Sequence, residues 1–223
     1  MDVDKLRKTI LQNRSCENYY IKNLSHVKFT CDFIRYDPTI FNIEYLLKHC
    51  TLNTDITDYL LDNFFCTIYD LINYQPLSER YMIKILKNKD PDVIFALTLY
   101  QKIPCRLLQH YLSVMDINMI CLNQFLDLQF IVNNREIISW ENLFPNYLMQ
   151  NIFNETFLAV FKECPIWDHV ATSNIPLSIL LKFEEKFTEK TYCDLEEKYN
   201  CNRSDLNICA LTEKMEDQTL NKI

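Results

Sequence analysis

The stretch Trp167-Asp168-His169-Val170, followed by Asn174-Ile175-Pro176-Leu177-Ser178 and Leu180-Leu181, contains the pattern that decides the fold. Trp167 and Val170 are three positions apart, as they would be on one face of a short helix. A segment containing proline then separates them from further apolar residues at helical spacing. The stretch therefore predicts a short helix, a turn and a second, amphipathic helix.

The same order recurs along the chain at a period of about 25 residues. Each unit opens with an apolar residue that has an apolar partner three positions later: Ile43/Leu46, Tyr69/Ile72, Ile94/Leu97, Ile117/Ile120, Trp140/Leu143, Trp167/Val170 and Tyr192/Leu195. A second apolar position follows each opening by 8 to 10 residues: Leu52, Leu77, Ile103, Phe125, Leu148, Leu177 and Cys201. Because one short helix pair cannot bury its own apolar face, we expect neighbouring units to stack.

The seven prolines support this division, because proline is tolerated at the start of a helix and disfavoured inside one. All seven lie at the expected turns, either two to five residues before an opening residue (Pro38, Pro91 and Pro165) or five to ten residues after one (Pro76, Pro104, Pro145 and Pro176). Candidate N-caps occupy the same turns: Asn53, Thr54 or Asp55 before Ile56, Ser78 after Leu77, and Asp90 before Pro91.

We therefore expect an all-α fold, a short solenoid or compact bundle of antiparallel helix pairs, with Trp140, Trp167 and Tyr69 in its interior. An irregular bundle whose helices are evenly spaced by chance would give the same pattern. Segments 130–132 and 137–139 are the most β-prone, but they are short. We expect residues 1–212 to form a single domain, with 1–42 as a degenerate N-terminal cap, 43–212 as repeats, and 213–223 as a polar frayed tail.

The chain of 223 residues contains no glycine, and this absence excludes several kinds of chemistry. Neither a phosphate-binding loop, nor the Gly-x-Gly-x-x-Gly dinucleotide turn, nor a Gly-x-Ser-x-Gly nucleophile elbow can be present. The chain also lacks the residue that most often closes a helix in the left-handed conformation. We therefore expect Asn, Asp or Pro to form its turns.

Charge argues against nucleic acid as the main ligand. The chain has 30 acidic and 23 basic residues, a net charge of −7 and a pI of 5.1, and binding to a phosphate backbone requires the opposite sign. The one basic cluster, Lys5, Arg7, Lys8 and Arg14, suits a solvated first helix, with a weak targeting signal as the alternative. No apolar run reaches 18 residues, so we expect no membrane span.

The ten cysteines show no Cys-x-x-Cys spacing, and the chain begins Met-Asp-Val-Asp-Lys without an apolar targeting segment. We therefore expect free, buried thiols in a reducing compartment, the cytoplasm, with the nucleus left open. A zinc site at His49-Cys50 or at Cys193, Cys201 and Cys209 is the less favoured interpretation. The carboxylate pairs Glu184-Glu185 and Glu196-Glu197 stand among lysines, which indicates exposed helix faces with ion pairs between residues four apart.

These observations predict no catalytic residue, no metal ligand and no cofactor. A Cys–His pair brought together by the fold would be the form of an enzyme that the sequence does not reveal. The aromatic residues are more informative, because neighbours such as Tyr19-Tyr20 and Phe64-Phe65 cannot both face one core. An exposed aromatic ring at such a point would suit a partner protein, since aromatic residues are enriched at the centres of interfaces.

The unit Trp167-x-x-Val170…Pro176-Leu177-Ser178…Leu181…Phe187, with its echoes at Trp140-x-x-Leu143 and Tyr69-x-x-Ile72…Leu77-Ser78, resembles short helical repeats in proteins of large DNA viruses. The Ile117 and Ile94 units depart from this pattern. The resemblance implies a non-enzymatic intracellular protein that binds another protein, as a viral factor engaging a host protein. The alternative is a structural virion component that acts by self-association. The binding face, the partner's identity and the oligomeric state stay open.

Overall fold

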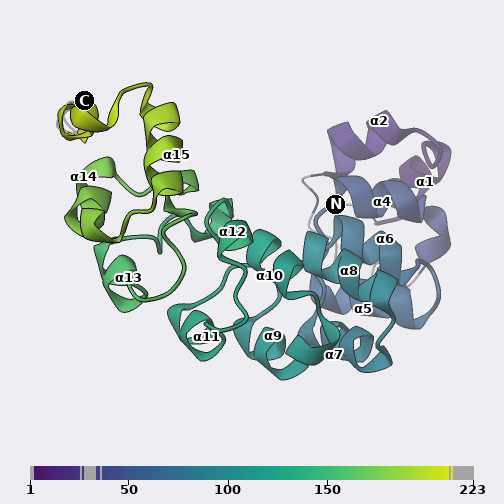
Figure 1. The fold of residues 1–223 in the computed structure, drawn as a ribbon. Helices are drawn as coiled ribbons and strands as arrows, with labels where there is room; N and C mark the ends of the chain where they lie inside the picture. The colour runs from purple at the N-terminus through teal and green to yellow at the C-terminus, as the bar shows by residue number, and fades with distance from the viewer. Residues whose placement is uncertain (1–2, 26, 28–33, 36, 211, 213–223) are drawn as a thin grey trace. The chain divides into compact units, whose positions relative to one another are not determined.

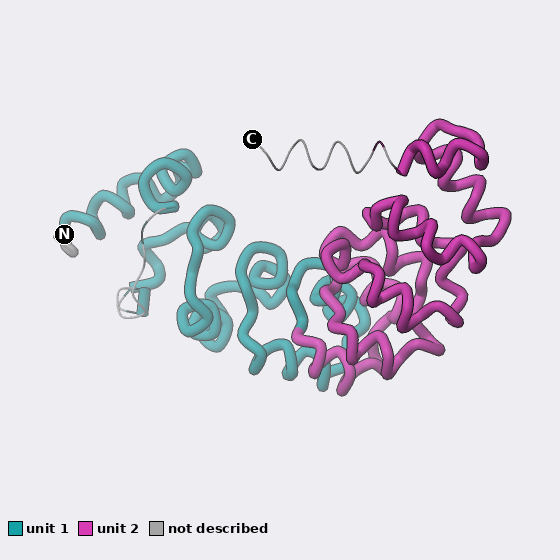
Figure 2. Tube along the Cα trace, turned by 90° about the vertical axis from the view of Figure 1, so that its left-hand side faces the viewer, with its two compact units in different colours: residues 1–103 teal, residues 104–223 magenta. Residues whose placement is uncertain are grey.

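The computed structural model describes residues 3–25, 27, 34–35, 37–210 and 212 of the chain. Every regular element within these residues is helical and none is a strand, which confirms the expected all-α class. Segment 213–223, expected to be a frayed tail, lies outside the described residues. The chain divides into two compact units, residues 1–103 and 104–223 (Figure 2). The single domain expected over residues 1–212 stays a prediction.

Unit 1 starts with α1 (Val3–Gln12). The short elements α2 (Glu17–Tyr19), the π-helical η1 (Tyr20–Leu24) and the 3-10 helix η2 (Pro38–Ile40) come after it. The helices α4 (Ile43–His49), α5 (Thr54–Asp62), α6 (Ile68–Tyr74), α7 (Glu79–Asn88) and α8 (Pro91–Tyr100) follow (Figure 1). α4 packs against α6, and α6 packs against α8. Helices two apart in the sequence are therefore neighbours in space, with α5 and α7 connecting them.

Unit 2 contains α9 (Cys105–Tyr111), η3 (Leu112–Val114), α10 (Ile117–Asn123), α11 (Leu128–Asn133), α12 (Trp140–Leu143), η4 (Tyr147–Met149) and α13 (Glu155–Val160). It continues with η5 (Val170–Thr172), α14 (Leu177–Leu180), η6 (Leu181–Lys186), α15 (Glu189–Tyr199) and η7 (Arg203–Asp205). α10 packs against α12, again skipping the helix between them. The β-prone segment 130–132 is part of α11, as the all-α expectation requires.

The apolar partners in the seven sequence pairs all lie in the core. Leu46, Ile72, Leu97, Ile120, Leu143, Val170 and Leu195 are each fully buried. The residues that open the pairs are less uniform: Trp140 and Trp167 are buried, as expected, but Tyr69 is 44% exposed. The expectation for Tyr69 is wrong because α6 buries Leu71 and Ile72, and Tyr69 lies about 200° around the helix from Leu71.

The second apolar position is displaced by one residue in two units. Phe125 is 51% exposed and Leu148 is half-buried, whereas Leu126 and Met149 are fully buried. The chain leaves α10 in an extended conformation at Gln124 (ψ 149°), and neighbouring side chains then point to opposite sides. Leu126 therefore faces the core in place of Phe125.

Helix starts follow the expected polar caps. Asn53 accepts a hydrogen bond from the Ile56 amide, and Asp90 accepts from the Asp92 and Val93 amides ahead of Pro91. Ser78 is the N-cap residue of α7, but its hydroxyl donates to Asp58 instead of capping the helix. Side-chain caps also begin helices at Asn42, Thr67, Asp116, Asp127, Asn154 and Thr188.

Helix ends are satisfied in a way that the sequence analysis missed. The buried Gln75 side chain donates to the carbonyls of Leu47 and Cys50, at the end of α4, and accepts from the Leu52 amide at 3.0 Å. Gln101, 26 residues later, donates to the carbonyls of Ile72 and Gln75, at the end of α6, and accepts from the Leu77 amide at 2.9 Å. Each glutamine thus satisfies three backbone groups that a helix end leaves unpaired.

Similar bonds occur in unit 2 with other residue types. The Asn146 amide donates to the carbonyls of Cys121 and Gln124 at 2.7 and 2.8 Å, at the end of α10. The Lys198 ammonium group donates to the carbonyls of Ala171 and Ser173 at 3.0 and 2.6 Å, at the end of η5. A side chain from about 25 residues further along the chain therefore completes these helix ends too.

Candidate functional site

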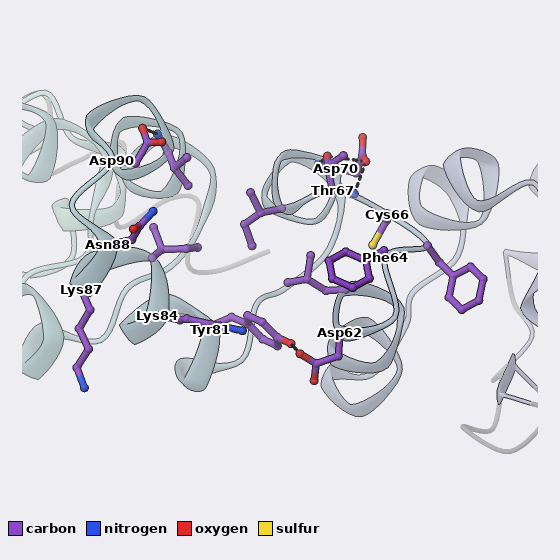
Figure 3. Close-up of a pocket in the computed structure, with 15 residues that line it drawn as sticks. Asp62, Phe64, Cys66, Thr67, Asp70, Tyr81, Lys84, Lys87, Asn88 and Asp90 are labelled. Carbon is purple, nitrogen blue, oxygen red and sulfur yellow. Dashed lines mark hydrogen bonds between the residues drawn. The ribbon is translucent and has the colours of Figure 1, made fainter.

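A groove of about 1050 Å³ opens on unit 1 where the end of α5, the start of α6 and the length of α7 meet (Figure 3). We call it the α5–α7 groove. Its lining combines apolar side chains with a few charged ones: Leu61, Asp62, Phe64, Phe65, Cys66, Thr67, Ile68, Asp70, Tyr81, Lys84, Ile85, Lys87, Asn88, Asp90 and Val93. A largely apolar hollow of this size with a few polar groups is typical of a binding site.

Phe64 is the most exposed large apolar residue of the described chain, at 93%. It follows the end of α5 in the left-handed conformation, with φ of 60°. The Phe64 amide donates to the Leu61 carbonyl, and the Phe65 amide donates to the Leu60 carbonyl at 2.9 Å. These two bonds define a Schellman turn, which holds the backbone beneath the exposed ring.

The residues on either side fix this turn further. The Phe65 ring packs on Tyr59, six residues earlier in α5, with ring centroids 6.2 Å apart. Thr67 and Asp70 then form a capping box that starts α6. The Phe64 ring is therefore exposed on a backbone segment that is hydrogen-bonded on both sides.

Polar and charged side chains join α5 to α7 beside the groove. The Tyr81 hydroxyl donates a short hydrogen bond to the Asp62 carboxylate, and Arg80 pairs with the same carboxylate at 3.3 Å. The Tyr81 hydrogen bond lowers the pKa of Asp62, while burial, followed by that bond, raises the pKa of Tyr81. The Lys84 amine lies over the Tyr81 ring, 5.0 Å from its centroid (Figure 3). These side chains thus form an ordered network.

Cys66 contributes a thiol to the groove that is not activated. Burial, with a smaller contribution from Asp70, raises the pKa of the Cys66 thiol to about 12. A thiol with this pKa is protonated at neutral pH, and the protonated form is a poor nucleophile.

The structure separates the two aromatic pairs singled out in the sequence. Phe64 points to solvent while Phe65 is half-buried, which confirms that this pair cannot share one core. Phe64 lies beyond the helix, because α5 ends at Asp62. Tyr20 is fully buried, and its hydroxyl accepts a hydrogen bond from the Asn42 amide at 2.7 Å.

The nine described cysteines are free, and Cys31 lies outside the described residues. Cys50 and Cys121 are buried as expected, and burial raises the pKa of each thiol to about 11. Burial was wrongly expected for Cys16 and Cys193, which are exposed. No group of three or more His, Cys, Asp or Glu residues that could hold a metal ion occurs among the described residues.

The remaining predicted charge clusters have specific partners. His49 contacts Glu17, with Nε2 and Oε1 2.9 Å apart. Lys182 pairs with Glu155 at 2.5 Å and Lys186 pairs with Glu163 at 3.0 Å, so these ion pairs join separate elements and not residues four apart. In the first helix, Arg7 pairs with Asp37 at 2.5 Å, so this part of the basic cluster is not simply solvated.

Sequence reasoning did not assign the α5–α7 groove, although two of its signals were available. Phe64-Phe65 was recognised as a pair that a core cannot bury, and Arg80, Lys84 and Lys87 share one face of α7 at helical spacing. In the residues that the structure describes, no helix is both long enough and apolar enough to cross a bilayer. Comparison with protein-family models, with curated proteins and with solved structures finds no match for this chain.

Proposed function

We propose that this chain is a non-enzymatic helical-repeat protein that binds a partner protein through the α5–α7 groove, with Phe64 as the anchoring side chain. The observation that carries the proposal is the Phe64 ring, 93% exposed on a hydrogen-bonded turn at the edge of a groove of about 1050 Å³. An exposed aromatic ring on a rigid backbone loses little conformational freedom on binding, so most of its burial contributes to affinity.

The repeat part of the proposal is supported by the helix-end hydrogen bonds. Gln75 and Gln101 each donate to two carbonyls of an earlier helix end and accept from one amide two residues beyond it. The packing of α4 on α6, and of α6 on α8, gives these two bonds the same setting. A repeat array is expected to form the same hydrogen bonds at equivalent positions of successive repeats, as Gln75 and Gln101 do.

The non-enzymatic part is supported by the state of the buried thiols. Burial raises the pKa of the Cys50, Cys66 and Cys121 thiols well above neutral, and this disfavours their use as nucleophiles. A viral origin and an intracellular location, in the host-cell cytoplasm or nucleus, belong to the same proposal. They are supported by the resemblance of the repeat unit to viral repeats and by the free thiols of the described cysteines.

Self-association, as in a structural virion component, is the second candidate function. It is favoured by the apolar residues that α8 leaves exposed, namely Phe95 at 52%, Leu99 at 37% and Tyr100 at 58%. An apolar face of this kind suits contact with a second protein surface. Sedimentation velocity over a range of concentrations tests this alternative, since a concentration-dependent dimer that Phe95→Ser abolishes would support self-association over partner binding.

The variant Phe64→Asn tests the main proposal, because asparagine tolerates the left-handed conformation and the turn should survive the loss of the ring. The matched control is Tyr147→Asn, since Tyr147 in η4 is another highly exposed aromatic residue, at 78%. We expect quantitative affinity purification from expressing cells to recover a protein with the wild-type chain and with Tyr147→Asn, and to lose it with Phe64→Asn. Equal recovery with all three chains would contradict binding through the groove.

A further inference from the structure

We infer that Cys201 and Cys209 form a reversible disulfide within one chain when the protein meets a low-molecular-weight disulfide such as oxidised glutathione. Cys201 follows the end of α15, and Cys209 lies eight positions later in the helical segment 206–210. Both residues belong to unit 2, so this inference is independent of the α5–α7 groove. It follows from the turn after α15, from the contacts of the returning chain, and from the contact between the two thiols.

The turn after α15 fixes the backbone at Cys201. Asn200 has the left-handed conformation, with φ of 49°, and its amide donates to the Glu197 carbonyl at 3.3 Å. The Cys201 amide donates to the Glu196 carbonyl at 3.1 Å. These two bonds form a Schellman turn, as the corresponding bonds do at Phe64. Cys201 therefore lies on a hydrogen-bonded backbone segment at the point where the chain leaves the helix.

The chain beyond this turn contacts α15 again. Arg203 pairs with Glu189 at 2.9 Å, and its guanidinium group lies over the Tyr192 ring, 3.4 Å from the ring centroid. Both partners are among the first four residues of α15, so the chain runs back along the helix. Leu206 is then fully buried, and Cys209, about one helical turn later, is half-buried. The segment that carries Cys209 is thus anchored on both sides of η7.

The two thiols meet at the end of this path. The Cys201 and Cys209 side chains lie within hydrogen-bonding contact of each other, and each is half-buried. Cys193, the first residue of the same eight-residue series, is exposed on α15. A disulfide requires its two sulfur atoms to approach to about 2 Å, so a pair that is already in side-chain contact needs little movement to form one. The geometry therefore favours the Cys201–Cys209 pair over a bond to Cys193.

The reaction is two steps of thiol–disulfide exchange. The thiolate of one cysteine attacks the small disulfide, which forms a mixed disulfide and releases one small thiolate. The thiolate of the other cysteine then attacks the protein sulfur of that mixed disulfide, and the second small thiolate leaves. The two protons lost by Cys201 and Cys209 go to the two small thiolates. The protein sulfurs are oxidised by two electrons, and the small disulfide is reduced by the same two.

The surroundings of the pair affect both the rate and the stability of this bond. Partial burial, followed by the contact with Cys209, raises the pKa of the Cys201 thiol to about 11, and the carboxylates of Asp205 and Glu196 act in the same direction. Exchange is therefore slow at neutral pH, because few Cys201 thiols are ionised. Strongly oxidising disulfides owe their reactivity to a stabilised thiolate in the reduced form, and Cys201 lacks this stabilisation. We therefore expect the disulfide to persist once it has formed.

Oxidation of the full chain in a glutathione buffer at pH ~8, followed by trapping of free thiols with N-ethylmaleimide, tests the inference. Trypsin places the three cysteines of this region on separate peptides, 191–198, 199–203 and 204–214, since it cuts after lysine and arginine. We expect mass spectrometry to find peptides 199–203 and 204–214 joined, in about tenfold or greater excess over any pair that includes 191–198.

Two serine variants give the controls. Cys193→Ser should leave the linked pair unchanged, whereas Cys209→Ser should abolish it and leave Cys201 as a mixed disulfide or a free thiol. Serine is close to cysteine in size and keeps a hydrogen-bond donor, and circular dichroism checks that each variant folds as the wild type does.

Three results would overturn the inference. The first is equal yields of the three possible peptide pairs, which would indicate random pairing. The second is a linked pair that forms only in denaturant, and the third is the formation of mixed disulfides alone. Oxidation of a mixture of ¹⁵N-labelled and unlabelled chains adds a further check, because peptides linked between a labelled and an unlabelled chain would show a bond between two molecules and would also overturn it.

Discussion

Phe64 has the left-handed backbone conformation that glycine usually adopts at the end of a helix, and this chain contains no glycine. Among the described residues three have positive φ: Phe64, Lys89 and Asn200. Asn200 suits the conformation, because its side chain tolerates the left-handed region better than others do. Phe64 and Lys89 bear a steric cost between Cβ and the backbone. At Phe64 the chain thus accepts strain at a position where the ring contributes almost nothing to the core.

Phe64→Asn should therefore increase the free energy of unfolding, by up to about 1 kcal/mol. The physical reason is relief of left-handed strain with almost no loss of buried apolar surface. Urea denaturation monitored by circular dichroism measures the change. A destabilisation of more than about 1 kcal/mol would mean that the ring packs in the fold, and would remove it as a binding anchor.

The buried thiols give a second prediction, which concerns their pH dependence. Burial raises the pKa of Cys66 to about 12 and that of Cys50 and Cys121 to about 11, so at pH ~8 few of these thiols are ionised. Alkylation by iodoacetamide should label the exposed Cys16 and Cys193 first. Labelling of Cys66 should rise about tenfold per pH unit until the pKa is approached or the chain unfolds. Peptide mass spectrometry measures each rate, and rapid labelling of Cys66 near pH 7 would contradict its protonated state.

At the scale of the elements, side chains close the helix ends where glycine or the next backbone segment would otherwise do so. Gln75 joins α6 to the end of α4, and Gln101 joins α8 to the end of α6. Replacement by leucine would leave an amide and two carbonyls buried without partners. We expect Gln75→Leu and Gln101→Leu each to lower the free energy of unfolding by about 2–4 kcal/mol.

The control for this prediction is Gln129→Leu. The Gln129 side chain is exposed on α11, and among the described residues its one hydrogen-bond partner is Asn133, at 2.7 Å, so its loss should change stability by less than about 0.5 kcal/mol. Guanidinium denaturation of the three variants gives the comparison. Equal midpoints for Gln75→Leu and Gln129→Leu would show that the helix-end bonds are not important for stability.

The elements were also where the sequence was most informative. Apolar residues three apart located the seven buried partners, because a helix must place such a pair on one face. The side of the helix that each opening residue faces could not be read in the same way. Tyr69 and Phe125 are large and apolar, yet both are exposed: Tyr69 is two positions before the buried Leu71, and Phe125 is one position before the buried Leu126. The groove escaped prediction because it depends on how α5, α6 and α7 meet, and this is set by side chains such as Asp62 and Tyr81 from different helices.

At the scale of the whole molecule, the open question is whether residues 1–103 and 104–223 unfold together. The chain forms two compact units. In the proposed repeat array, by contrast, each repeat stabilises its neighbours, and this predicts that all of the repeats unfold together. The two tryptophans, Trp140 and Trp167, both lie in unit 2 and are both buried, so their fluorescence reports on that unit alone. Gln75 lies in unit 1, so the Gln75→Leu variant perturbs the other unit.

We expect Gln75→Leu to shift the tryptophan-monitored unfolding midpoint to lower denaturant, in step with the midpoint seen by circular dichroism. In a repeat array whose units are strongly coupled, loss of stability in one unit lowers the stability of the whole, and different probes then give coincident transitions. A tryptophan transition that stays at the wild-type midpoint, while the circular dichroism signal splits into two steps, would mean that the units unfold independently. The single domain predicted over residues 1–212 would then be replaced by two domains, with the α5–α7 groove contained in the first.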